Sequence, residues 1–220
     1  MKVSDLFHAQ MEPALSEWIR QFSSPLDLFA SIHILFERLK LQRVEGAVED
    51  GAIIIGPVHV GAGSVVHSHA TIRGPVIIGP RAVVNGHSEI GPACYIGMQC
   101  IIGHGAYITE SMLMNGVLVS PGAFVGRSVL GVGATVGPHA VIGHSELTPA
   151  ARPFQSGSQL PTLLGDYSSV GASSTMNPGT VVGCRTSIGS GVVADGIYEA
   201  NRSVTLTQKL EIQSSADEAV

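Results

Sequence analysis

Aliphatic side chains recur every six residues through the first half of this chain. Starting at Val48 and counting in sixes, every position up to Ile108 is Val or Ile, eleven in succession: Val48, Ile54, Val60, Val66, Ile72, Ile78, Val84, Ile90, Ile96, Ile102 and Ile108. The fourth residue after each is usually small, as at Ala70 and Cys94, and the next residue is often Gly, as at Gly79. This period matches neither an amphipathic helix nor a single alternating strand, so it indicates an internal repeat.

The six-residue period predicts an all-β solenoid, a left-handed parallel β-helix. Three short strands and three tight turns form one coil of about 18 residues, and each coil buries its apolar side chains against its neighbours. The aliphatic residue fills the interior, the small residue fits where a turn narrows it, and Gly supplies turn conformations that branched residues resist. We predict about seven coils over residues 44–202.

The repeat changes phase twice and is then interrupted. Val119 and Val125 fall one residue early, and the set Leu130, Val136 and Ile142 falls one earlier still, which predicts two five-residue rungs. Residues 148–163 carry Pro, Gly and Ser without the repeat, so they predict a loop that leaves the solenoid. The repeat resumes at Leu164.

The two ends differ from the solenoid. Residues 1–43 are predicted to be helical, because Ser24-Pro25-Leu26-Asp27 is typical of a helix start and apolar residues follow at helical spacing: Leu28, Ile32, Leu35, Phe36 and Leu39. We expect these helices to cover the open end of the solenoid or to pack between subunits. Residues 203–220 form an extension whose first part alternates like a strand and whose last part is a polar tail.

Composition narrows the function classes. The net charge of −5 provides no basic surface for nucleic acid, and no stretch is long and apolar enough to span a membrane. Acidic and polar residues near the start are unlike a signal peptide, so we expect a cytoplasmic protein. Cys94, Cys100 and Cys184 have no metal-ligand spacing, and we expect Cys94 and Cys100 to be inert thiols in the core.

Several motifs resemble one family of the hexapeptide-repeat acyltransferase superfamily. They are Ser24-Pro25-Leu26-Asp27-Leu28-Phe29, Val44 to Gly51, Gly74 to Gly79, Phe124 to Gly131 with its phase change, and Leu164-Gly165-Asp166-Tyr167. They are similar to the C-terminal acetyltransferase domain of bifunctional sugar nucleotidyltransferases, the N-acetylglucosamine-1-phosphate uridyltransferase type. The nucleotidyltransferase domain of that family has no counterpart before residue 44.

The resemblance implies a homotrimer with active sites between subunits and acetyl-CoA, or another acyl-CoA, lying along the coils. Four functional positions of the family depart here. The catalytic His falls on Pro121, the sugar-binding Arg on Asn85, the sugar-binding Lys on Thr109 and a CoA-phosphate Arg on Gly196. Two functions therefore stay open: an acyltransferase with a changed small-molecule acceptor, such as a sugar or sugar nucleotide, and a non-catalytic trimeric scaffold or regulatory partner of a nucleotidyltransferase.

Acyl transfer to an amine or hydroxyl requires a base beside the nucleophile. His104 is our candidate, because its placement after Ile102 resembles that of the catalytic His in other hexapeptide acyltransferases. His69 and His87 lie 18 residues apart and should stack on one edge. We predict substrate contacts from four residues, Asn85, His87, Glu89 and Arg152, and cofactor contacts from Gly171 and Ser173.

A metal site is a further alternative. His139 and His144, with His104 about two coils earlier, have a spacing similar to that of the zinc ligands in trimeric β-helix carbonic anhydrases. Zinc requires convergent ligands, and these histidines occupy later turn positions than the ligands of that family. We therefore assign no metal ligand from the sequence.

Overall fold

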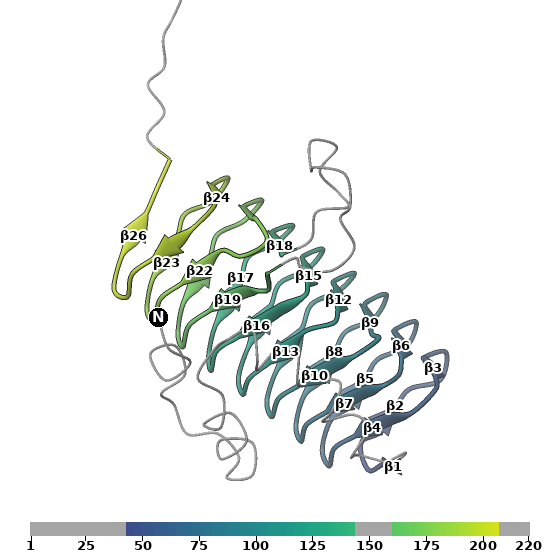
Figure 1. The fold of residues 1–220 in the computed structure, drawn as a ribbon. Coiled ribbons are helices and arrows are strands. Elements are labelled where there is room, and N and C mark those ends of the chain that lie inside the picture. Colours follow the sequence, from purple (N-terminus) through teal and green to yellow (C-terminus); the bar gives the residue numbers. More distant parts are fainter. Residues whose placement is uncertain (1–42, 144–159, 207–220) are drawn as a thin grey trace, which may run out of the picture.

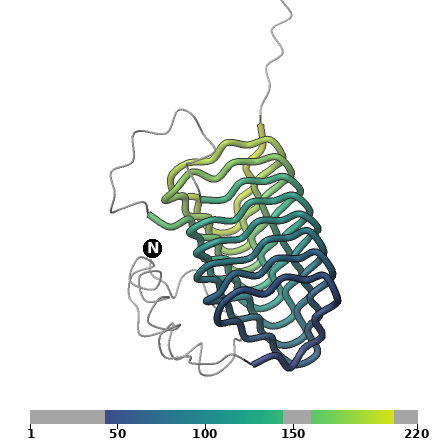
Figure 2. Tube along the Cα trace, turned by 90° about the vertical axis from the view of Figure 1, so that its right-hand side faces the viewer, coloured from purple at the N-terminus to yellow at the C-terminus, as the bar shows by residue number. Residues whose placement is uncertain are grey.

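The chain winds into a parallel β-helix (Figures 1 and 2). The structure, a computed structural model, describes residues 43–143 and 160–206. These residues contain 26 short strands that form three parallel sheets, so the predicted fold class is confirmed. With three strands to a coil, the strands make eight coils and two strands of a ninth, one coil more than predicted. The predicted N-terminal helices lie outside the described residues, except that Arg43 belongs to the first strand.

Each sheet takes one strand from every coil. Sheet A contains β1 (Arg43–Val44), β4 (Val58–Val60), β7 (Val76–Ile78), β10 (Cys94–Ile96), β13 (Met112–Leu113), β16 (Ser128–Leu130), β19 (Thr162–Leu164), β22 (Val181–Val182) and β25 (Ile197–Tyr198). Sheet B contains β2 (Ala47–Val48), β5 (Val65–Val66), β8 (Val83–Val84), β11 (Ile101–Ile102), β14 (Leu118–Val119), β17 (Thr135–Val136), β20 (Ser169–Val170), β23 (Ser187–Ile188) and β26 (Ser203–Val204). Sheet C contains β3 (Ile53–Ile55), β6 (Thr71–Arg73), β9 (Glu89–Ile90), β12 (Tyr107–Thr109), β15 (Phe124–Gly126), β18 (Val141–Ile142), β21 (Thr175–Met176) and β24 (Val193–Ala194).

The strand register confirms both phase changes. Early coils pair residues 18 apart, as in Val66 with Val84, whereas Ile108 pairs with Val125, 17 residues later. The shortened rungs lie where the chain passes from sheet C to sheet A, from β12 to β13 and from β15 to β16. The interruption of the repeat leaves at this same corner, between β18 and β19. Shortening a turn there keeps every aliphatic side chain inside, because a one-residue shift within a strand would turn it outward.

The predicted interior positions form one core. The aliphatic residues from Val60 to Ile188 that continue the repeat are at most 2% exposed. Hydroxyls that replace alanine in the small positions donate to backbone carbonyls of the next coil: Ser64 Oγ to Gly79 O at 2.7 Å and Ser174 Oγ to Gly189 O at 2.8 Å. A buried hydroxyl is tolerated at such a position because its hydrogen bond is made.

Three details refine the sequence predictions. The predicted loop extended too far, because Thr162 and Leu163 belong to β19, where they pair with Ser128 and Val129. Residues 144–159 lie outside the described part. The predicted strand in the C-terminal extension is present at Ser203–Val204, which pairs with β23.

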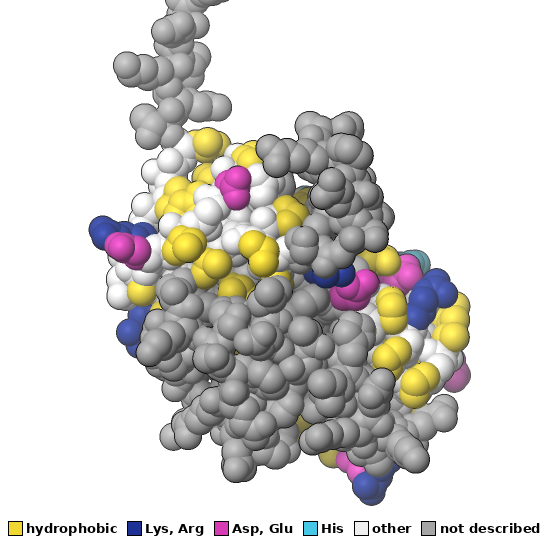
Figure 3. Space-filling view, in the orientation of Figure 1, with side chains coloured by type: hydrophobic (Ala, Val, Ile, Leu, Met, Phe, Trp, Pro, Cys, Tyr) yellow, Lys and Arg dark blue, Asp and Glu magenta, His cyan; other side chains and the backbone are white. Residues whose placement is uncertain are grey.

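The cysteine prediction is consistent with this fold. Cys94 and Cys100 are buried, and this burial raises the pKa of each thiol to about 12, so both are unreactive. No disulfide joins the three cysteines. Large apolar side chains are exposed near the two ends of the solenoid, for example Ile53 and Val193, and also in middle coils, for example Leu118. Apolar side chains are visible on the described surface at both ends in Figure 3. Within residues 43–143 and 160–206, no helix is long and apolar enough to cross a membrane.

Two adjacent residues of β18 test which side chains of a strand point into the core and which point outward. Ile142 is fully buried in the core, whereas its neighbour Val141 points outward and is only partly buried. We expect Ile142→Ala to lower the free energy of unfolding by about 2–5 kcal/mol, because it leaves a cavity that adjoining coils cannot fill. Val141→Ala should cost about 1 kcal/mol or less. Urea unfolding followed by circular dichroism measures both, and equal losses would contradict the assignment.

Candidate functional site at the histidine edge

Histidines gather at the corner where the chain passes from sheet B to sheet C. We call this corner the histidine edge; it carries His67 and His69 after β5, His87 after β8, His104 after β11 and His139 after β17. His69, His87 and His139 occupy the same turn position and have φ of 64°, 57° and 55°. Other coils place Gly51, Gly105 or Gly122 there. Side chains in this left-handed conformation are uncommon outside glycine, with Asn, Asp and His enriched among them.

Three of these imidazoles contact one another in consecutive coils. The rings of His69 and His87 stack with their centroids 5.0 Å apart, which confirms the predicted stacking. The ring of His104 meets that of His87 edge-on, also at 5.0 Å. Since neighbouring coils lie about 4.8 Å apart, this contact follows from the register of β5, β8 and β11.

His104 and Pro121 occupy the same turn position one coil apart. Each is the second residue after its sheet B strand, and Ile102 pairs with Val119 in the register. The backbone agrees, because the Gly122 N–H donates to the His104 carbonyl at 3.0 Å. The imidazole that we predict as the base therefore lies one coil before the position where the related family has its catalytic His. Its catalytic role remains a prediction.

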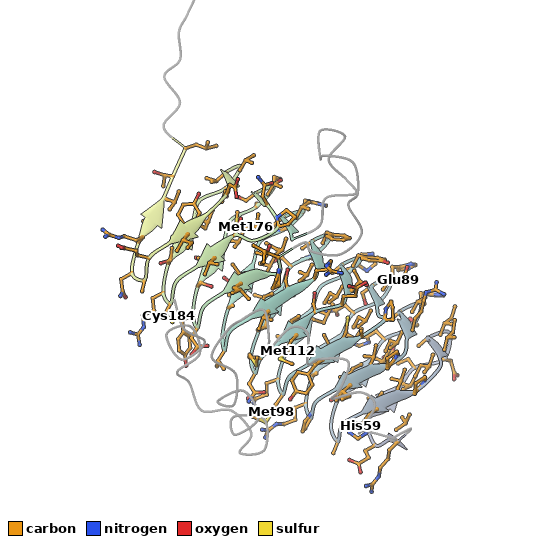
Figure 4. All side chains as sticks on the ribbon, in the orientation of Figure 1. His59, Glu89, Met98, Met112, Met176 and Cys184 are labelled. Atoms are coloured by element: carbon orange, nitrogen blue, oxygen red, sulfur yellow. The ribbon has the colours of Figure 1, made fainter. Side chains whose placement is uncertain are left out.

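The predicted substrate-binding residues lie in the coil between His69 and His104. The side-chain amide Nδ2 of Asn85 donates to the Ile102 carbonyl at 2.8 Å. This hydrogen bond links Asn85 to the next coil, so the donor is already partly used. Glu89, on the outer face of sheet C (Figure 4), accepts from Arg73 Nε at 2.9 Å. His87, between them in sequence, makes the two ring contacts described above. Arg152 lies outside the described residues.

The predicted cofactor residues lie on the same edge, three coils beyond His104. Gly171 and Ser173 follow β20, so they are about 14 Å from His104 along the solenoid, at 4.8 Å per coil. Gly171 also has a packing role, because an added Cβ would meet the backbone of Ser190. Ser173 has a φ of 53° and donates its backbone N–H to the Pro138 carbonyl at 2.9 Å. Contact of these two residues with the cofactor stays a prediction.

Sequence reasoning missed one oriented imidazole. His67 Nδ1 lies 2.9 Å from Glu49 Oε1, and the Ser68 backbone N–H donates to Glu49 Oε2 at 2.9 Å. The Ser68 hydrogen bond and then the His67 contact lower the pKa of Glu49 below 4.5. A carboxylate at Nδ1 favours the tautomer whose Nε2 accepts protons. The 18-residue spacing of Glu49 and His67, one coil, is the signal that would have found this pair.

The other family positions lie at a different corner. Thr109 ends β12 and Gly196 follows β24, both where the chain passes from sheet C to sheet A. An ion pair between Arg127 and Glu110, 2.8 Å long, occupies the same corner. Within one chain this corner and the histidine edge are the opposite margins of sheet C. A ligand that contacts both this corner and the histidine edge must therefore reach across sheet C or lie between two chains.

The carbonic-anhydrase alternative gains no support from the described residues. His104 and His139 are two coils apart, about 10 Å along the solenoid. His144 lies outside the described residues. Among residues 43–143 and 160–206, no three His, Cys, Asp or Glu side chains are close enough together to hold a metal ion.

Comparison with known proteins finds one matching family model. The family model "GMPPB C-terminal domain" matches residues 72–151, which span β7 to β18. This match over part of the chain, together with the coils of parallel strands, supports the hexapeptide-repeat superfamily that the sequence motifs predicted. No curated protein sequence matches the chain.

Solved structures that match this chain include three enzymes or enzyme-family members. A hexapeptide transferase family protein from Anaplasma phagocytophilum is 21% identical over 44% of this chain and 65% of its own, with a TM-score of 0.32. UDP-N-acetylglucosamine O-acyltransferase (LpxA) from Moraxella catarrhalis is 15% identical over 72% and 71%, with a TM-score of 0.43. GDP-perosamine N-acetyltransferase from Caulobacter crescentus, in complex with CoA and GDP-perosamine, is 14% identical over 82% and 62%, with a TM-score of 0.31. This chain thus spans less than two thirds of the first and third of these proteins.

The Glu49–His67 pair gives a pH-dependent prediction. We expect His67→Ala to raise the pKa of Glu49 only part of the way back to 4.5, because the stronger Ser68 hydrogen bond remains. The carboxylate-dependent contacts are present above the ordinary carboxyl pKa and are lost as the pH falls through the lowered one. A carbon-13 NMR titration of the carboxyl group measures this shift. His69→Ala, which removes an imidazole without this contact, should leave the titration unchanged, and a full return to 4.5 in His67→Ala would contradict the order of causes.

Proposed function

We propose that this chain is an acyltransferase that moves an acyl group, acetyl in the first instance, from a CoA thioester to an amine or hydroxyl of a small molecule. A sugar or sugar nucleotide is the proposed acceptor. The observation that supports this function most is the histidine edge, where three imidazoles from consecutive coils are in contact and His104 shares its turn position with Pro121. The resemblance to hexapeptide-repeat acyltransferases supports the reaction class.

In the proposed reaction, His104 is the general base. Its imidazole accepts a proton as the acceptor nitrogen or oxygen attacks the thioester carbonyl carbon. The tetrahedral intermediate collapses with cleavage of the carbon–sulfur bond, and the imidazolium returns the proton to the CoA thiolate. The products are the acylated acceptor and free CoA, and no other reactant is needed.

The proposed contacts extend from this base in both directions along the edge. Asn85, His87 and Glu89, in the preceding coil, bind the acceptor together with Arg152. Gly171 and Ser173 contact the acyl-CoA three coils further on. We propose a cytoplasmic location, because three cysteines without a disulfide suit a reducing compartment.

We also propose that the chain is a homotrimer whose active sites lie between subunits. Exposed apolar side chains flank the histidine edge on both sides: Ile101 and Leu118, 46% and 39% exposed on sheet B, and Tyr107, 37% exposed on sheet C. Tyr107 stacks on Phe124 at 5.4 Å, so it belongs to a continuous aromatic surface. Contact with a second copy would bury this surface and bring that copy's residues to the edge.

The trimer has a direct test. Light scattering of the purified chain should give three times 22.8 kDa. Leu118→Asp should shift the mass toward one chain, because the charge would be buried at the interface without a partner. Ser187→Asp, also on the outer face of sheet B but far from the apolar patch, should leave the mass unchanged. A monomeric wild-type chain would remove this part of the proposal.

The second candidate function is a non-catalytic trimeric scaffold or regulatory partner of a nucleotidyltransferase. Its support is specific: Pro121, Asn85, Thr109 and Gly196 stand where the related family has its base and its cationic ligands. Proline has no proton-accepting side chain, and neither Asn nor Thr neutralises a phosphate. Binding of acyl-CoA separates the two candidates.

We expect acetyl-CoA to raise the melting temperature of the chain. A ligand at a hundred times its Kd contributes about 2.7 kcal/mol, or roughly 5–10 °C for a chain of this size. Turnover should fall by about 10²–10⁴ in His104→Ala, while His59→Ala, which removes an imidazole from β4 on sheet A, should keep it. Absence of a shift with any acyl-CoA favours the scaffold. Binding with full activity in His104→Ala would leave the function standing and remove His104 as the base.

A further inference from the structure

The outer face of sheet A is apolar through six consecutive coils. Its strands alternate, so that Ile96, Leu113 and Leu130 point into the core while the residue before each points outward. The register aligns the outward residues in one column: Ile77, Tyr95, Met112, Val129, Leu163 and Val181. We call this set the sheet A column; Met112 is labelled in Figure 4.

The centre of the sheet A column is buried, although it points away from the core. Met112 and Val129 are 0% exposed, Leu163 is 3% and Tyr95 is 8%. Among the outward residues of sheets B and C in these coils, Ile101, Leu118 and Tyr107 are 37–46% exposed. At the N-terminal end of this face, the Nδ1 atom of His59 (Figure 4) is also buried and has no hydrogen-bond partner among the described residues. The described strands surround only the inner side, so another part of the same chain must cover this face.

We propose that residues 13–41 cover the sheet A column. Three segments lie outside the described residues: 1–42, 144–159 and 207–220. Residues 1–42 lead directly into Arg43, the first residue of sheet A, and they carry the apolar series Leu28, Ile32, Leu35, Phe36 and Leu39. Residues 144–159 are rich in Pro, Gly and Ser, and residues 207–220 are mostly polar. Only the first segment offers a regularly spaced apolar series of about the length of the column, five residues for six coils.

The length of this segment fits the column. Five strand spacings separate Ile77 from Val181, about 24 Å at 4.8 Å each. A helix over residues 25–40, as the sequence pattern predicts, is also about 24 Å long at 1.5 Å per residue. Its apolar residues recur about once per turn, close to the spacing of the coils.

This cover leaves the histidine edge open. In a three-sided coil the corner between sheets B and C lies opposite sheet A. Residues 13–41 would thus close one of the three faces and leave sheets B and C for ligand and for a second copy. The inference is independent of the proposed reaction, since it rests on burial and register alone.

Photo-crosslinking tests the assignment in the full chain. Tyr95 is replaced by p-benzoyl-phenylalanine, an aromatic residue of similar shape, and the crosslinked peptides are identified by mass spectrometry. We expect crosslinks to peptides from residues 13–41 of the same chain. The matched control carries the probe at Tyr107, on sheet C, and should give no crosslink to that segment. In the Tyr95 probe chain, Leu35→Asp should abolish the crosslink.

Each other outcome overturns the proposal. Crosslinks from position 95 to residues 144–159 or 207–220 would assign the cover to another segment, and crosslinked dimers would assign it to a second copy. The single tryptophan, Trp18, provides a readout that needs no probe. Met112→Asp should move its fluorescence maximum most of the way to the unfolded value, with the β-sheet circular dichroism retained, while Val193→Asp on sheet C should not. An unchanged Trp18 spectrum in Met112→Asp would contradict the docking.

Discussion

Burial between successive coils is the interaction on which the rest of this structure depends. A single coil has no interior of its own, so each aliphatic side chain is covered only by the side chains directly before and after it. That requirement fixes one inward residue per strand in every coil. It also explains why the chain changes a turn by one residue, between β12 and β13 and between β15 and β16, without changing the strands. The inward residues of successive coils stay aligned, and only the turn at the corner is one residue shorter.

The same register organises the candidate site. Side chains at one turn position are brought to within one strand spacing of each other, although 17 or 18 residues separate them in sequence. This is how His69 and His87 come into contact, and how Glu49 orients His67. His104 meets His87 from the neighbouring turn position of the next coil. A repeating fold therefore makes lines of residues rather than pockets. A site on such a line becomes enclosed only when another surface is placed beside it, which is the physical reason for placing the proposed active site between subunits.

The three faces of the solenoid are chemically unequal. Sheet A presents a column of apolar side chains that is buried at its centre, while sheets B and C expose theirs around the histidine edge. The sides of the solenoid therefore differ: the outer face of sheet A is buried at its centre, and the opposite corner carries imidazoles, which can exchange protons. The exposed Leu118 and Tyr107 and the imidazoles between them form one surface, so assembly and chemistry are expected to depend on the same residues.

The sequence by itself determined the architecture. The unbroken series from Val48 to Ile108 specified the period, and the early positions of Val119 and Leu130 located both shortened rungs, because a six-residue repeat converts directly into interior positions. It also predicted that His69 and His87 would stack, since one coil separates them. The coil count, the extent of the loop at Thr162 and Leu163, and the partner of His67 were not obtained in this way.

Only the tertiary structure decided what the side chains outside the core do. The period says that Tyr95 and Tyr107 both point outward, but their exposures of 8% and 37% depend on what lies over each face. Likewise, the spacing of Asn85, Glu89 and Glu49 does not reveal that Asn85 donates to the Ile102 carbonyl, that Glu89 pairs with Arg73 or that Glu49 holds His67. Interior positions are set by a local repeat that is visible in the sequence, whereas outer contacts are set by distances between coils and faces, which arise only when the chain is wound.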